Sequence, residues 1–201
     1  MGLHQWPFMA YVSIACTVNG HKQTIQYCGG PVVQKRWVIT AAHSTDVNIT
    51  LFVENNCAEN ESTFMDLQLR YKPEEMYDSF SNQASEMQVT VGSKDIPKAT
   101  VHEVSRIKRH EFNRRTSSSN DIALLELKDV LEFGPQINRI CLPNKEPRTG
   151  MTATIIGCGK TKLNNMSAHA ELIDSKGDSG SPLLREIGGS WYAIGIVRGH
   201  E

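Results

Sequence analysis

Short stretches of apolar residues recur along the chain, and turn-forming or polar residues bound each of them. Many of these stretches are rich in β-branched or aromatic residues, which is typical of strands. Within 64–71, apolar Met65, Leu67, Leu69 and Tyr71 alternate with polar residues, which predicts one half-buried strand. Further strands are predicted at 8–14, 37–40, 101–107, 122–127, 151–156 and 191–197. Their spacing predicts an all-β barrel or sandwich with almost no helix.

Composition excludes several classes of function. The 201 residues include 21 basic and 22 acidic side chains, and the net charge of -1 gives no reason to expect nucleic acid or an anionic membrane as a partner. No apolar run approaches the roughly 20 residues needed to span a bilayer. A chain of this length can bury roughly 70% of its unfolded surface, which is enough for a core.

One turn-forming stretch carries the candidate chemistry. Small residues lie on both sides of Ser179 in Gly177-Asp178-Ser179-Gly180-Ser181-Pro182, and such a turn can present a hydroxyl. A serine hydroxyl is a weak nucleophile unless a base takes its proton and donors receive the charge on the attacked carbonyl oxygen. The backbone N–H groups of Gly177 and Ser179 can form this oxyanion hole, since Gly177 has no Cβ to prevent the required turn. Ser179 is therefore the candidate nucleophile.

Two upstream stretches supply the matching base and acid. His43 ends Thr40-Ala41-Ala42-His43, and Asp121 lies in Asn120-Asp121-Ile122-Ala123-Leu124-Leu125. Together with the serine stretch they resemble the T-A-A-H, D-I-A-L-L and G-D-S-G-G-P blocks of the chymotrypsin-like, or trypsin-like, serine proteases. The chain order His, Asp, Ser is also the order in this family. The resemblance implies that His43 accepts the proton of Ser179 and that Asp121 orients the imidazole.

Each of these residues also has a structural interpretation when taken alone. A single histidine is more often structural than catalytic, and an aspartate or a Gly-rich stretch is often only a cap or a turn. Three blocks in the family order across most of the chain favour the catalytic interpretation.

The resemblance implies two Greek-key antiparallel β-barrels with the active site in the cleft between them. The first is expected at 1–136, with a long polar insertion at 44–88, and the second at 137–201. The second is expected to be incomplete, because 158–177 is short and the family's final strand and helix have no counterpart. The chain is accordingly expected to be a peptidase domain truncated at both ends.

The substrate pocket and the oxyanion hole depart from the family pattern. Ile173 lies six positions before Ser179, where trypsin-like relatives have the aspartate at the pocket base. Counting back from Ser179 without a gap places Ile173 at the pocket base, which predicts an apolar or blocked pocket. A shift of one residue would place Asp174 there instead, and the pocket would then select Lys or Arg. In relatives the residue matching Asp178 pairs with an Ile-Val-Gly-Gly terminus, which this sequence lacks. If Asp178 then turns elsewhere or stays solvated, the resemblance implies an oxyanion hole that is unformed, as in a zymogen.

Secretion is expected from sequons and cysteines, although the first residues contain no signal peptide. Three sequons begin at Asn48, Asn60 and Asn165, and these are the expected glycosylation sites. The cysteines are Cys16, Cys28, Cys57, Cys141 and Cys158. In the family, the residue matching Cys28 bridges to one that is Ser44 here, so this disulfide is expected to be lost or moved to Cys57 or Cys16. Cys141 matches the cysteine that bonds a propeptide in many two-chain relatives.

The resulting prediction is a secreted serine endopeptidase that acts on proteins or peptides through an acyl-enzyme. No cofactor or metal is expected, since the cysteines lack the short spacing of a zinc site. Protein inhibitors are possible partners, a membrane and nucleic acid are not expected, and the chain is expected to be a monomer. The alternative is a catalytically silent homologue that binds protein partners through the same cleft.

Overall fold

The computed structural model describes residues 6–18, 21–45, 87–93, 98–113, 119–148, 150–157, 160–161, 165–166 and 179–198. The fold is all-β, as predicted, and the helical turn η1 (His43–Thr45) is the single helical element of these residues. The strands are β1 (Met9–Val18), β2 (His21–Gln34), β3 (Trp37–Thr40), β4 (Met87–Val91), β5 (Thr100–Arg109), β6 (Ala123–Leu127), β7 (Thr154–Ile155), β8 (Lys160–Thr161), β9 (Asn165–Met166), β10 (Pro182–Ile187) and β11 (Ser190–Ile196).

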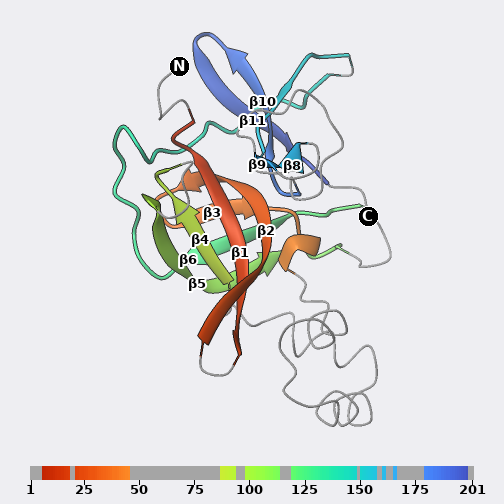
Figure 1. Ribbon diagram of the computed structural model, residues 1–201. Coiled ribbons are helices and arrows are strands. Elements are labelled where there is room, and N and C mark those ends of the chain that lie inside the picture. The colour runs from red at the N-terminus through yellow and green to blue at the C-terminus, as the bar shows by residue number, and fades with distance from the viewer. Residues whose placement is uncertain are drawn as a thin grey trace.

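The first six strands form a closed barrel in the order β1-β2-β3-β6-β5-β4 (Figure 1). All of its neighbouring strands are antiparallel, and β1 closes the barrel by pairing with both β2 and β4. Closure leaves no free sheet edge, so the backbone polar groups of these strands find partners within the barrel. The barrel is therefore a rigid support for residues at its rim.

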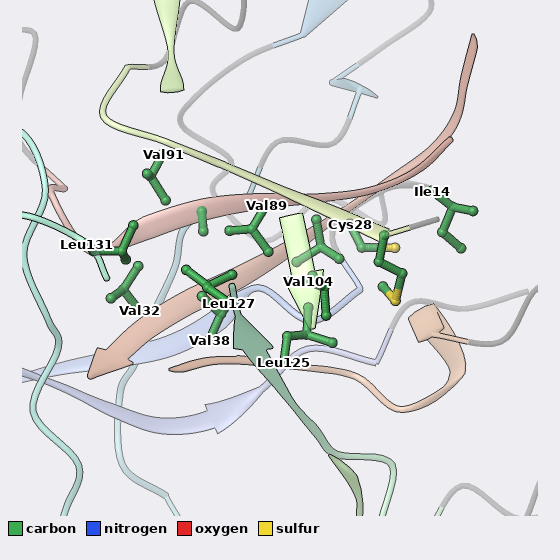
Figure 2. Packing of buried hydrophobic residues seen from close by; sticks show 13 residues of the cluster. Ile14, Cys28, Val32, Val38, Val89, Val91, Val104, Leu125, Leu127 and Leu131 are labelled. Atoms are coloured by element: carbon green, nitrogen blue, oxygen red, sulfur yellow. The ribbon is translucent and has the colours of Figure 1, made fainter. Parts of the chain in front are cut away.

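Alternating apolar residues fill the barrel interior (Figure 2). Ala10, Val12 and Ile14 on β1 belong to one buried cluster, because side chains two residues apart on a strand point to the same face. Burying a Val, Leu or Ile side chain contributes roughly 1.5–3 kcal/mol before the loss of conformational entropy. The buried cluster consists of Ala10, Val12, Ile14, Cys28, Val32, Val38, Met87, Val89, Val91, Val104, Leu125, Leu127 and Leu131.

A second, partial sheet has the strand order β11-β10-β7 and packs against the barrel. This arrangement agrees with the expected double barrel whose second half is incomplete. Two backbone bonds join residues after the barrel to its first strands: Ile140 N–H donates to Val32 O at 2.9 Å, and Asn138 N–H donates to Pro7 O at 2.8 Å. The shared apolar cluster consists of Phe8, Val33, Ile39, Ile140, Ile156, Leu184 and Ala193.

Most predicted strands exist, but their bounds differ. The strand predicted at 37–40 is correct, and those at 8–14 and 101–107 extend to Met9–Val18 and Thr100–Arg109. The stretch 151–156 forms only Thr154–Ile155, because pairing with β10 involves just these two residues. Strands β2, β4, β8, β9 and β10 were not predicted. The stretch 64–71 and most of the insertion lie outside the described residues, and the boundary between 136 and 137 stays a prediction.

No helix in the described part of the chain has the length and apolar character to cross a membrane.

His102 on β5 makes the stability of the fold depend on pH. Burial lowers the pKa of His102 from its ordinary value of 6.5, against the opposing effect of Asp129. The Nε2 atom of His102 is buried without a hydrogen-bond partner among the described residues. The folded state therefore favours the neutral ring, and the unfolded chain binds more protons at and below pH 6.5. This contribution to stability is present above that pH and is lost as the pH falls through the folded-state pKa.

We expect the free energy of unfolding to fall between about pH 7.5 and about pH 5, and to fall less in His102→Leu because the leucine cannot take up a proton. Urea unfolding of both proteins at the two pH values measures this difference. An equal fall in both proteins would show that His102 does not contribute.

Candidate active site

His43 and Asp121 meet because of the register between β3 and β6. The two strands are antiparallel, and Thr40 at the end of β3 pairs with Ala123 at the start of β6. His43 comes three residues after Thr40, and Asp121 comes two residues before Ala123. Both residues thus leave the barrel at the same point of its rim, although 78 positions separate them in the sequence.

Two hydrogen bonds join His43 to the Asp121 carboxylate. The backbone N–H of His43 donates to Oδ1 at 2.8 Å, and Nδ1 of the ring lies 2.6 Å from Oδ2. The Asp121 side chain is only 8% exposed, whereas that of His43 is 38% exposed. Because two donors require the carboxylate in one orientation, the ring is held with Nδ1 toward Asp121. Its other nitrogen, Nε2, is then the atom that can accept a proton from a nucleophile.

A strained turn holds Asp121 in place. Asn120 has a φ of 57°, a left-handed conformation that asparagine tolerates better than most residues. The Asn120 carbonyl accepts the N–H of Ile122 at 2.8 Å and the side-chain amide of Asn113 at 3.2 Å. The backbone on both sides of Asp121 is therefore fixed by hydrogen bonds.

Ser179 lies in a turn that packs against the segment leading to His43. The Ser179 carbonyl accepts the N–H of Gly29 on β2 at 2.8 Å. Gly180 has a φ of +82°, and a Cβ there would collide with Thr40 Oγ1 and Gly29 O and lie 3.0 Å from Ala41 N. Ala41 is two residues from His43. The backbone thus brings the serine turn to the same rim of the barrel as the His43–Asp121 pair.

The other predicted site residues fall largely outside the described part of the chain. This applies to Gly177 of the oxyanion hole, to Ile173 and Asp174 of the pocket, and to the sequons at Asn48 and Asn60. Asn165 lies in β9, which pairs with β8. The roles assigned to these residues stay predictions.

Arg198 is a contact of the site that sequence reasoning missed. Its Nε lies 3.3 Å from Asp121 Oδ2, the same oxygen that faces His43 Nδ1. Arg198 follows Gly195-Ile196-Val197 at the end of β11.

The structure describes the side chains of Cys28 and Cys141. Cys28 is buried and Cys141 is exposed, and Cys141 forms no disulfide within the described residues. Ser44, where the family has a cysteine, is buried, and its hydroxyl has no hydrogen-bond partner in the described ranges. Cys57, Cys158 and the side chain of Cys16 lie outside what the structure describes. The alternative pairings of Cys28 stay open.

Among the described residues, no group of three His, Cys, Asp or Glu side chains could hold a metal ion.

Comparison with known proteins identifies similar sequences. The Trypsin family model matches residues 77–175, a stretch that contains Asp121 and ends four residues before Ser179. CLIP domain-containing serine protease B15 of Anopheles gambiae is 25% identical over 237 residues, which cover 98% of this chain and 58% of that protein. CLIP domain-containing serine protease B4 of the same organism is 24% identical over 211 residues, covering 85% of this chain and 54% of the relative. The chain thus spans little more than half the length of these curated relatives.

Proposed function

We propose that this chain, which belongs to the trypsin-like serine protease family, is a secreted serine endopeptidase that hydrolyses peptide bonds in proteins. The observation that carries the proposal is the His43–Asp121 pair. One nearly buried carboxylate accepts the backbone N–H of His43 and faces its Nδ1 at 2.6 Å. This arrangement leaves Nε2 free to act as a general base, which is what a serine nucleophile requires.

In the proposed reaction, Ser179 Oγ attacks the carbonyl carbon of the scissile bond while His43 Nε2 takes the hydroxyl proton. The C–N bond then breaks, and the imidazolium gives this proton to the leaving amine. Water then attacks the acyl-enzyme while His43 Nε2 takes its proton, and the imidazolium returns this proton to Ser179 Oγ as the carboxylic acid is released. Asp121 stabilises the imidazolium that forms in both halves of the reaction.

The remaining roles rest on the sequence resemblance. The N–H groups of Gly177 and Ser179 would bind the oxyanion, and removing one such donor costs about 10²–10³ in rate in a comparable site. Ile173 at the pocket base would favour an apolar residue before the scissile bond, and Asp174 in its place would favour Lys or Arg. Protein inhibitors would bind in the same cleft as protein substrates.

The test is hydrolysis of fluorescently labelled casein by the folded chain. We expect activity that Ser179→Ala abolishes, because no other atom of the proposed mechanism replaces Oγ. Ser181→Ala is the matched control, since Ser181 is two residues away, is buried, and has a hydroxyl without a hydrogen-bond partner among the described residues. Equal activity in Ser179→Ala would exclude this nucleophile. No activity in a folded wild-type sample would favour a silent homologue that binds protein partners.

A further inference from the structure

The carboxylate of Asp121 has a third neighbour, the guanidinium of Arg198. Its Nε lies 3.3 Å from Oδ2, while His43 Nδ1 lies 2.6 Å from the same oxygen and His43 N donates to Oδ1. The Arg198 side chain is 47% exposed, so it reaches the nearly buried carboxylate from the solvent side. Three nitrogen atoms therefore surround one carboxylate at the rim of the barrel.

Arg198 directly follows the strand region that also holds the serine turn. Val197 accepts the N–H of Gly180 at 2.8 Å, and its own N–H donates to Ser181 O at 2.8 Å. The turn carrying Ser179 is thus bonded to the residue before Arg198, and Arg198 contacts the acid that holds His43. These contacts connect the partial sheet with the His43–Asp121 pair on the barrel.

We propose that Arg198 is a positioning residue for the active site. Its positive charge beside Oδ2, together with the two His43 nitrogen atoms, favours the carboxylate orientation in which Oδ1 and Oδ2 both face His43. The guanidinium attracts the negatively charged oxygen, and this attraction biases the orientation of the carboxylate. Its effect on rate rests on the proposed function, whereas its effect on the geometry of the pair does not.

The expected effect of replacing Arg198 follows from the exposure of its side chain. A half-exposed ion pair is weakened by water and salt, so its contribution is modest. We expect Arg198→Ala to lower kcat about three- to tenfold with less than a twofold change in KM, because the residue acts through Asp121. Arg198→Lys keeps a charged donor and should restore most of the loss. Arg185→Ala is the matched control, because Arg185 lies on the same hairpin, is half-buried, and donates to Thr152 O at 3.4 Å rather than contacting Asp121.

A measurement that does not need activity is the ¹H NMR signal of the proton between His43 Nδ1 and Asp121, followed in the Ser179→Ala background. We expect this low-field signal to shift or broaden in Arg198→Ala, to recover in Arg198→Lys, and to stay unchanged in Arg185→Ala. Thermal unfolding confirms that each variant is folded.

An unchanged signal and an unchanged kcat in folded Arg198→Ala would overturn the proposal, as would equal changes in Arg185→Ala. If the wild-type chain shows no hydrolysis and the NMR signal still depends on Arg198 as described, the proposed function fails and the positioning role stands.

Discussion

Asp121→Asn should lower kcat by about four orders of magnitude, the size of loss this substitution causes in the type enzyme of the family. His43 directs two nitrogen atoms at this side chain, one at each oxygen. An amide has only one acceptor oxygen. If that oxygen accepts the backbone N–H, the amide NH₂ faces Nδ1 and selects the ring tautomer whose proton is on Nε2. Such a ring cannot accept the proton of Ser179.

The measurement is kcat for a fluorogenic peptide that the wild-type chain cleaves. Asp129→Asn is the matched control, because Asp129 is an exposed carboxylate next to β6 and lies outside the site. Near wild-type activity in folded Asp121→Asn would show that the carboxylate does not orient His43.

Gly180→Ala should destabilise the chain by about 2–6 kcal/mol. The backbone at this position has a φ of +82°, which costs a residue with a Cβ about 1–3 kcal/mol. The added methyl group would also collide with Thr40 Oγ1 and Gly29 O, and steric overlap of this kind costs a further 1–3 kcal/mol or so. Neither neighbour can move easily, because Thr40 Oγ1 itself donates to Gly29 O at 2.9 Å in the barrel wall.

Urea unfolding of the variant and the wild type measures this loss. Gly134→Ala serves as the control, since nothing lies within 4 Å of a Cβ at that position and its φ is not left-handed. A change below about 1 kcal/mol in Gly180→Ala would contradict the close packing of the serine turn against β2 and β3. A similar loss in both variants would point to a general effect of alanine rather than to this contact.

Strands with continuous apolar or β-branched signals could be predicted from the sequence. Trp37–Thr40 was found with its correct bounds, and the fold class followed from several strands of this type. β2 was missed because Gly29 and Gly30 lie inside it, and glycine weakens a strand signal. The structure gives the reason for Gly30, because a Cβ there would lie 2.9 Å from Val38 Cγ1.

The missed strand β10 had a signal in the sequence that could have been used. β10 and β11 are joined by Gly188 and Gly189, both with positive φ, and two glycines between short apolar runs are typical of a two-residue hairpin. The run on the β10 side is short and contains Arg185 and Glu186, which hid the alternation of buried and half-buried positions in this strand.

The site could be predicted only as far as local sequence blocks describe it. His43, Asp121 and Ser179 each lie in a block of several matching residues, and the structure places His43 against Asp121. The contact of Arg198 with Asp121 could not be predicted, because it depends on where the end of β11 lies relative to the barrel rim. That position is fixed by tertiary contacts between residues far apart in the chain.

The central claim is that Ser179 is a nucleophile activated by His43 and Asp121. Its most direct test is reaction of the folded chain with a fluorophosphonate probe, followed by mass spectrometry of the labelled peptide. The account predicts one adduct per chain, on Ser179, that is absent in Ser179→Ala and strongly slowed in Asp121→Asn. A sample that unfolds cooperatively but forms no adduct, or that is labelled at another residue, would contradict it.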